Sequence, residues 1–299
     1  MRAKKETNKR RARMDLCNER TVKRLMEAHG ISFRKKYGQN FLIDASVVEE
    51  IADLCCGDTT STILEIGPGI GTLTQELCKR YRKVIALEID SGLIPVLHET
   101  MAAYDNLTLY NEDVMRANLP ALLAPAFSAG PVSVCANLPY YITTPILMTL
   151  LESGLPFDSI TVMVQREVAD RICAKAGGKD YGAITAVIAY YGKASTLFSV
   201  SPDLFLPPPQ VTSTVIRIDR HKEKPYRPQD ELLLFRTISA AFGQRRKTLC
   251  NALTAGFPSL GKESIAAVIA DCGFSADVRG ERLDIADFVR LSDAIGKIL

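Results

Sequence analysis

The sequence of 299 residues lacks the features of zinc-binding, membrane-spanning and secreted proteins. It has only three histidines, and its eight cysteines form no Cys-x-x-Cys pair, so we expect neither a zinc site nor another metal site. No apolar run approaches the roughly 18 residues of a membrane span. The first 17 residues contain no apolar core, which excludes a secretory signal. We therefore expect a cytoplasmic protein with reduced thiols and no membrane association.

Charge is distributed unevenly along the chain. Residues 1–36 hold 13 Lys and Arg against four Asp and Glu, a net of +9, so the remainder carries −6 of the total of +3. A basic arm on a nearly neutral body is common among nucleic-acid-binding proteins, although a solvated charged tail has the same composition. We interpret residues 1–30 as a basic N-terminal arm, and composition leaves both alternatives open.

Strand-like and helical patterns alternate from residue 61 onward. Short apolar runs rich in β-branched residues predict strands over 61–66, 82–89, 107–111, 132–137, 159–165, 194–200 and 212–218. Helical spacing predicts helices over 71–81, 91–104, 143–153, 165–176 and 181–192. This alternation predicts a doubly wound, mostly parallel α/β sheet, with a hairpin-like end formed by the last two strands.

The final 70 or so residues show only helical periodicity. A polar, proline-containing stretch at 221–230 is a candidate linker. Beyond it, the spacing predicts helices over 231–242, 246–256, 262–273 and 285–299. We therefore expect one large domain over 31–220 and a small helical domain over 221–299.

A glycine-rich turn follows the first predicted strand, in the segment ILEIGPGIGTLTQEL. Gly67 and Gly69 permit a tight turn in which the backbone approaches a ligand closely. The spacing differs from the Gly-x-Gly-x-x-Gly dinucleotide fingerprint, and Glu65 just before the turn is poorly suited to a pyrophosphate. S-Adenosylmethionine carries a cationic sulfonium and an amino-acid group but no phosphate, so acidic and amide neighbours suit it better.

Acidic residues follow the next two predicted strands. Glu88 lies 21 residues beyond Gly67, where this architecture has the acid that bonds ribose hydroxyls. Asp113 follows the third strand, in a position to accept a hydrogen bond from an adenine amino group. Either acid alone is more often an ordinary strand-end residue. Together with the glycine turn, they predict a site for S-adenosylmethionine.

The tetrapeptide Asn137-Leu138-Pro139-Tyr140 ends the fourth predicted strand, at the edge where open α/β sheets keep their active sites. The Asn137 side-chain oxygen and the Leu138 carbonyl can accept both hydrogens of an exocyclic amine. The Tyr140 ring can stack on the base that carries this amine. An Asn-x-Pro sequence also forms ordinary turns. Combined with the cofactor residues, however, it predicts methylation of an adenine amino group.

These motifs resemble the ribosomal RNA adenine dimethyltransferase family, over most of residues 33–255 and in order. The matching segments are YGQNFLID at 37–44, EIGPGIGTLT at 65–74, LEID at 87–90, EDVM at 112–115, NLPYYITTP at 137–145, MVQREVADR at 163–171, YGAIT at 181–185, FLPPPQVTSTVIRI at 205–218 and AFGQRRKTL at 241–249. The resemblance is strongest to the bacterial branch that acts on small-subunit (16S) rRNA. The erythromycin-resistance methylases, which act on large-subunit rRNA, share the architecture.

The resemblance implies a Rossmann-like class I S-adenosylmethionine-dependent methyltransferase with a mostly parallel seven-stranded sheet and a small C-terminal helical, RNA-binding domain. It implies cofactor contacts from Gln39, Asn40, Leu42, Gly67, Glu88, Asp113 and Asn137. It implies catalytic contacts to the target base from Asn137, Leu138 and Tyr140, with Phe205 as a second stacking candidate that has core filling as its alternative. Tyr141 stands where many relatives have Asn, which leaves the reaction unchanged but alters the pocket wall.

The implied activity is transfer of methyl groups to the N6 amines of two adjacent adenosines, in a hairpin near the 3′ end of 16S rRNA. The implied partner is this rRNA in the assembling small subunit, bound by a monomer. Two basic clusters are expected to hold RNA phosphates. They are Arg34, Lys35 and Lys36, and Arg245, Arg246 and Lys247; a solvated helix face is the alternative for the second.

Three other functions remain to be weighed. An adenine methylase acting on DNA or on large-subunit rRNA would use the same catalytic residues. A non-catalytic assembly or transcription factor could keep the fold, although such a protein is expected to lose the glycine turn or Asn137. A nicotinamide dehydrogenase is disfavoured by the glycine spacing and by the absence of an evident catalytic His or Lys pair.

Overall fold

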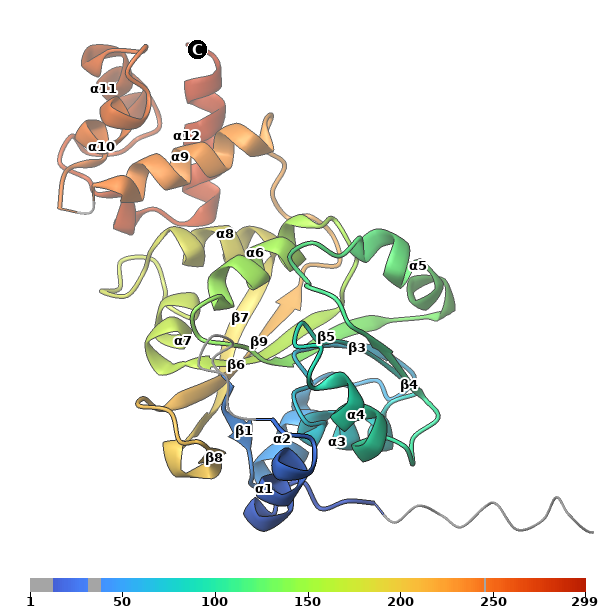
Figure 1. Ribbon diagram of the computed structural model, residues 1–299. Coiled ribbons are helices and arrows are strands. Elements are labelled where there is room, and N and C mark those ends of the chain that lie inside the picture. Colours follow the sequence, from blue (N-terminus) through green and yellow to red (C-terminus); the bar gives the residue numbers. More distant parts are fainter. Residues whose placement is uncertain (1–12, 32–38, 245) are drawn as a thin grey trace, which may run out of the picture. The chain divides into compact units, whose positions relative to one another are not determined.

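The computed structural model describes residues 13–31, 39–244 and 246–299 (Figure 1). The chain forms two compact units. Unit one consists of residues up to Arg166 together with Thr196–Arg217, and unit two consists of Glu167–Ser195 and Ile218–Leu299. None of the described helices has the length and apolar character needed to cross a bilayer.

A seven-stranded sheet is the main framework of the fold. Its strands, in spatial order, are β4 (Leu107–Tyr110), β3 (Lys83–Leu87), β2 (Thr62–Ile66), β5 (Val132–Asn137), β6 (Ser159–Gln165), β9 (Ser213–Arg220) and β7 (Gly192–Val200). The first five run parallel to their neighbours. The residues of the central strands β2, β5 and β6 are almost all buried, as expected for parallel strands covered on both faces.

The last strand of the chain, β9, lies between β6 and β7. The Arg166 N–H, at the end of β6, donates to the carbonyl of Thr212, just before β9 begins. At the other edge, a Cβ on Gly192 at the start of β7 would lie 2.4 Å from the Asp219 carbonyl oxygen, near the end of β9. Strand β9 therefore runs antiparallel to both neighbours. The predicted sheet, mostly parallel with a hairpin-like end, is confirmed.

Helices cover both faces of the sheet, with α2 and α3 on one face and α5 and α6 on the other (Figure 1). The helices from the first half of the chain are α1 (Glu19–Ala28), α2 (Ala45–Leu54), α3 (Thr72–Arg80), α4 (Ile94–Thr100), α5 (Leu119–Ala129) and α6 (Thr143–Glu152). The Asp44 carboxylate caps α2 by accepting from the Val47 N–H. Helix α5 was not predicted, because Pro125 lies inside it and proline is expected to break a helix.

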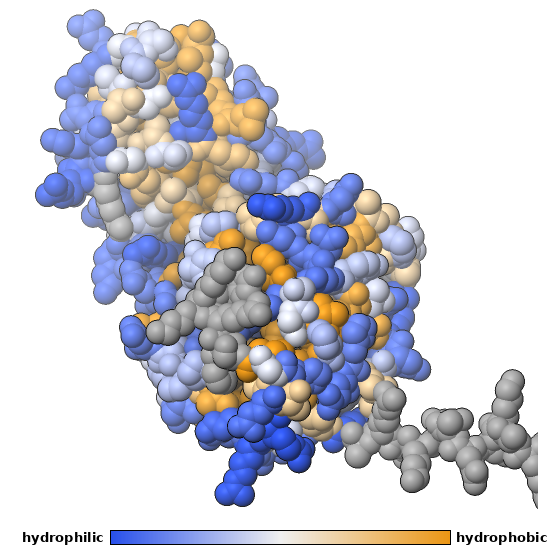
Figure 2. Space-filling model, in the orientation of Figure 1, coloured by the Kyte–Doolittle hydropathy of each residue, from blue (hydrophilic) through white to orange (hydrophobic). Residues whose placement is uncertain are grey.

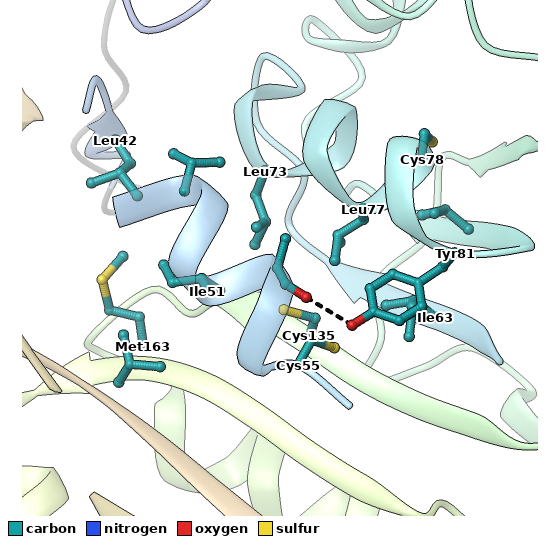
Figure 3. Packing of buried hydrophobic residues seen from close by; sticks show 14 of the residues in the cluster. Leu42, Ile51, Cys55, Ile63, Leu73, Leu77, Cys78, Tyr81, Cys135 and Met163 are labelled. Atoms are coloured by element: carbon teal, nitrogen blue, oxygen red, sulfur yellow. Dashed lines mark hydrogen bonds between the residues drawn. The ribbon is translucent and has the colours of Figure 1, made fainter. Parts of the chain in front are cut away.

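One part of the core lies around α2 and α3 (Figure 3). There the Tyr81 hydroxyl donates to the Ala52 carbonyl at 2.7 Å, so the polar end of a buried ring is satisfied. All eight cysteines are free and six are buried, including Cys55 and Cys135 in this cluster.

The face shown in Figure 2 is mostly hydrophilic. Tyr141 and Leu232 are among the few large apolar or aromatic side chains exposed in the described chain.

The described part of the predicted N-terminal arm is a packed element of unit one. Helix α1 buries Val22, Leu25 and Met26 in a second apolar cluster, together with residues such as Ile70 and Leu93. The Nε2 of His29, just after α1, is hydrogen-bonded to the Glu99 carboxylate of α4 at 2.8 Å. Residues 13–31 are therefore not a solvated tail. The interpretation of residues 1–12 lies outside the described residues.

Unit two is built from helices. Its main helices are α8 (Ala183–Tyr191), α9 (Glu231–Gly243), α10 (Leu249–Gly256), α11 (Lys262–Asp271) and α12 (Ile285–Gly296), preceded by the short α7 (Arg166–Ile172), which begins at the last residue of unit one. Helix α8 packs against α9 and α12, which is why residues 167–195 join this unit. The sequence predicted a boundary at residue 220 and did not foresee this packing; the predicted domain ranges stay a prediction.

Substitution Leu25→Ala tests the packing of α1. Leu25 is 4% exposed, so its truncation removes buried contacts and should lower the free energy of unfolding by about 2–5 kcal/mol. The exposed Lys23 on the same helix is the matched control, and Lys23→Ala should cost about 0.5 kcal/mol or less. Chemical denaturation measures both. Equal stabilities for the two variants would show that α1 does not pack on unit one.

Candidate active site

A cavity opens in unit one at the carboxyl ends of β2, β3 and β5. Eight predicted site residues contribute to its wall: Gln39, Asn40, Leu42, Gly67, Glu88, Asn137, Leu138 and Tyr140. Among the other residues lining it are Phe41, Glu65, Gly69, Leu93 and Tyr141. Strand ends from positions distant in sequence therefore meet around one space, as parallel strand order requires. The individual roles of these residues stay predictions.

The glycine turn between β2 and α3 forms one side of the cavity. Gly67, Gly69 and Gly71 all have positive φ angles, of 69°, 62° and 95°. At Gly69 a Cβ would lie 3.1 Å from the ring of Phe41, so a side chain is excluded there by space as well as by conformation. The Gly69 N–H donates to the Glu88 carboxylate at 3.1 Å. A carboxylate already occupies the turn, which argues against a phosphate in the same position.

Three acidic side chains gather beside this turn. Glu65, Glu88 and Asp90 are all nearly fully buried. Burial raises the pKa of Glu65 to about 8 and that of Glu88 to about 7. One oxygen of Glu65, Oε2, has no hydrogen-bond partner within the described chain. A buried carboxylate with an unsatisfied oxygen is suited to a cationic ligand.

Asp90 is a site residue that the sequence reasoning did not single out. Its carboxylate accepts from the Gln39 side-chain amide at 2.9 Å and from the Gly92 N–H at 3.0 Å. The bond from Gln39 joins segment 39–42 to the end of β3. The signal was available, since Asp90 follows Glu88 by two residues and therefore lies at the same strand end.

The Asn137 side chain is oriented by the backbone of the same segment. Its Nδ2 donates to the Asn40 carbonyl at 3.3 Å. Because an amide has one donor end and one acceptor end, this bond leaves Oδ1 available as an acceptor. The orientation is fixed by the hydrogen-bond network, which is the standard criterion for assigning an amide. This bond favours the amide orientation that the sequence argument needs, and the catalytic role of Asn137 stays a prediction.

The residues after Asn137 form a tight turn. Leu138 is buried, and its N–H donates to the Met163 carbonyl at 3.2 Å. The Tyr140 hydroxyl is hydrogen-bonded to Ser213 Oγ, and burial raises the pKa of Tyr140. The ring of Tyr140 is thus held by its polar end, against the wall of the cavity. Such anchoring favours a fixed surface for a flat ligand.

Two predicted site residues are not brought to the cavity wall. Phe205 is 2% exposed and lies in the core, where strand β8 (Phe205–Leu206) pairs with β1 (Phe41–Leu42). A ring this deeply buried presents no face to a base, so the structure favours core filling over stacking. Asp113 accepts from the Met115 N–H in the turn after β4. Its contact with the cofactor adenine stays a prediction.

Of the predicted basic clusters, the structure describes two members. Arg246 and Lys247 are exposed in unit two, just before α10. Arg34, Lys35, Lys36 and Arg245 lie outside the described residues. Despite the gathered carboxylates, no group of His, Cys, Asp and Glu side chains in the described chain has the arrangement of a metal site.

The chain is similar to known proteins over most of its length. The family model described as ribosomal RNA adenine dimethylase matches residues 30–295. "Ribosomal RNA small subunit methyltransferase A" of Lachnoclostridium phytofermentans is 47% identical, covering 88% of this chain and 91% of the relative. The protein of the same name from Geobacillus kaustophilus is 43% identical, with 95% and 98% covered. The chain belongs to the ribosomal RNA adenine dimethylase family.

Solved structures agree with the fold of this dimethylase. A dimethyladenosine transferase from Plasmodium falciparum superposes with a TM-score of 0.72 at 24% identity, covering 84% of this chain and 95% of the other. The 23S rRNA methyltransferase ErmE gives a TM-score of 0.65 at 24% identity, with 86% and 100% covered. These likenesses confirm the class I methyltransferase fold with its C-terminal helical region.

S-Adenosylmethionine is the cofactor of this dimethylase, and the residues present fit it. The unsatisfied Glu65 oxygen and the Glu88 carboxylate lie on the wall of one cavity and suit a ligand that carries positive charge and ribose hydroxyls. Gly67 has no heavy atom within 4 Å of a hypothetical Cβ, so its open side leaves room for a ligand. Glu65 beside the glycine turn disfavours the pyrophosphate of a dinucleotide. The expectation of S-adenosylmethionine rather than a nicotinamide cofactor is confirmed.

Glu65→Gln tests the buried carboxyl through stability and binding together. Because the folded-state pKa of Glu65 is raised to about 8 from 4.5, the folded protein holds a proton that the unfolded chain releases. Its contribution to stability is present below pH 4.5 and is lost as the pH rises through 8. The melting temperature of Glu65→Gln relative to the parent should therefore increase steadily from pH 5 to pH 8, and its cofactor affinity should fall.

The exposed Glu49 of α2 provides the control. Glu49→Gln should show a melting difference that does not change over this pH range. Thermal melting of the unliganded proteins and calorimetric titration with S-adenosylmethionine measure the two effects. A pH-independent difference for Glu65→Gln, with unaltered cofactor affinity, would remove Glu65 from the site.

Proposed function

We propose that this protein is the S-adenosylmethionine-dependent dimethyltransferase of small-subunit rRNA. It transfers methyl groups to the N6 amines of two adjacent adenosines, in a hairpin near the 3′ end of 16S rRNA. The relatives that support this assignment are 43–47% identical over most of the chain. The observation that carries it is the orientation of Asn137, whose amide oxygen is left as an acceptor in the cavity that also contains the buried acids.

The chemistry requires the amine to become a nucleophile. The lone pair of the adenine amine is delocalised into the ring, so the amine is flat and weakly reactive. Asn137 Oδ1 and the Leu138 carbonyl accept its two hydrogens and draw them out of the ring plane. The lone pair then becomes localised and points away from these acceptors. Positioning and hydrogen bonding supply the catalysis.

When bound, the cofactor supplies an electrophilic methyl group on its sulfonium. Glu65 and Glu88 neutralise positive charge in the cofactor region, and the turn at Gly69 keeps the backbone close to it. The acidity of the amine rises as it acquires a fourth substituent, so water can remove its proton and no side-chain base is required. The Tyr140 ring stacks on the flipped adenine, which offsets the unstacking by about 1–3 kcal/mol.

The partner is rRNA. The proposal also includes the assembly state of the subunit that carries this rRNA and the residues that bind it. The assembling small subunit is the form in which the hairpin is recognised, by a monomer of this protein in the cytoplasm. Arg246 and Lys247 are exposed and bind RNA phosphates. Recognition then depends on shape and backbone charge more than on base sequence.

A strain that lacks this protein should lose dimethyladenosine from 16S rRNA, and Asn137→Ala should fail to restore it. The reason is that alanine removes the acceptor that localises the amine lone pair. Mass spectrometry of digested rRNA measures the modification, and wild-type complementation is the control. The purified variant should bind the RNA almost as well as the parent. Full restoration by Asn137→Ala would refute the role of this residue, and loss of the modification from 23S rRNA instead would refute the substrate.

The double variant Arg246→Gln with Lys247→Gln tests the basic cluster. Each phosphate contact contributes about one unit to the slope of log affinity against log salt, so the slope should flatten by up to about two. Affinity at low salt should fall uniformly across RNA sequences. Titration at several salt concentrations measures the slope. The exposed pair Lys222 and Lys224, replaced in the same way, shows whether any loss of charge has this effect. An unchanged slope in the first variant would identify its residues as ordinary surface charge.

A further inference from the structure

Three chain segments of unit one are linked by hydrogen bonds, and one of them, the turn after β5, lines the cavity. The turn after β5 is joined to β6 by the bond from the Leu138 N–H to the Met163 carbonyl. The end of β6 is joined to the segment before β9 by the bond from the Arg166 N–H to the Thr212 carbonyl, at 3.0 Å. The hydrogen bond between the Tyr140 hydroxyl and Ser213 Oγ links the turn after β5 to the start of β9. Tyr140 of the cavity wall is therefore linked to the Arg166 backbone through the consecutive residues Thr212 and Ser213.

Tyr141 is an aromatic residue at the opening of the cavity. It lines the cavity next to Tyr140, yet 61% of its surface is exposed, which is the second-largest exposure among the large apolar and aromatic side chains of the described chain. Tyr140 is partly buried, and its hydroxyl is anchored by a hydrogen bond, so its ring forms part of the cavity wall. The more exposed Tyr141 ring lies at the opening of the cavity. An exposed ring at the mouth of a base-binding cavity offers a second stacking surface.

Arg166 is the cation on the segment that is linked to Tyr140 through Thr212 and Ser213. The residue directly follows β6, one strand away from Asn137, and is exposed. Its neighbour Glu167 is engaged by Arg171, and within the described part of the chain the Arg166 guanidinium forms no ion pair. A guanidinium is well suited to bind a phosphate, because two of its N–H groups can donate to two phosphate oxygens in a bidentate arrangement. No role in the reaction described above uses this residue.

We propose that Tyr141 and Arg166 form a second nucleotide site, which holds the nucleotide adjoining the one being methylated. Tyr141 stacks on its base, and Arg166 binds the phosphate next to it. This inference rests on the proposed function, because a substrate with two adjacent adenosines leaves one at the opening whenever the other is inside. The two adenosines then exchange places between the cavity and its opening, so one site serves both methylations.

The test is a double-mutant cycle, in which a substitution of Tyr141 is combined with a change of the adjoining nucleotide in the RNA. The hairpin is prepared within reconstituted, partly assembled small subunits, with one target adenosine intact and the adjoining one replaced by an abasic nucleotide. For the wild-type protein this replacement should lower kcat/KM for the remaining adenosine by about tenfold, because the stacking partner of Tyr141 is lost. For Tyr141→Ala and Tyr141→Leu, the intact hairpin should already react at the reduced rate, and the abasic change should add little.

Controls separate the ring from other effects. Tyr141→Phe keeps the ring and should behave like the wild type, and all Tyr141 variants should retain the wild-type affinity for S-adenosylmethionine. Arg166→Gln should flatten the salt dependence of KM for RNA by about 0.7, whereas Arg166→Lys should preserve it. An abasic penalty that is absent in the wild type, or equally large in Tyr141→Ala, would overturn the second site. Failure of the wild type to methylate the intact hairpin would instead refute the proposed function.

Discussion

The hydrogen bond from Asn137 Nδ2 to the Asn40 carbonyl determines what the cavity can do. It joins the end of β5 to a segment nearly a hundred residues earlier, and in the proposed mechanism it decides which end of the amide meets the target. That segment is itself held from two directions. Strand β1 pairs with β8, and Gln39 donates to Asp90. An error in any of these supports would turn or displace the one side chain whose acceptor the reaction needs.

The acids on the other side of the cavity have the opposite character, because they are costly in the unliganded protein. Glu65 and Glu88 are buried with raised pKa values, and one Glu65 oxygen lacks a partner in the described chain. A well-packed neutral side chain would be more stable there. Their presence makes sense as preorganisation for a positively charged ligand, since burial strengthens the attraction that the ligand gains. The two buried acids thus lower the stability of the unliganded protein and raise its affinity for a positively charged ligand.

The sequence was sufficient to predict the parallel sheet, the glycine turn and the tetrapeptide at 137–140, because each depends on local periodicity or on residues at strand ends. It did not predict the pairing of β1 with β8, since strands of two residues leave no periodic signal. For the same reason the sequence left Phe205 open between base stacking and core filling, and the structure places it in the core. Helix α5 was missed because of Pro125, and the packing of α8 on α9 is a tertiary preference invisible in local pattern.

The most direct test of the account is a crystal structure of the protein with S-adenosylhomocysteine and an RNA hairpin containing both target adenosines. The account predicts that the N6 nitrogen of one adenosine lies about 3 Å from both Asn137 Oδ1 and the Leu138 carbonyl, with Asn137 Nδ2 still bonded to Asn40. An adenine amine positioned away from both oxygens, or an Asn137 amide turned so that its nitrogen faces the base, would contradict it.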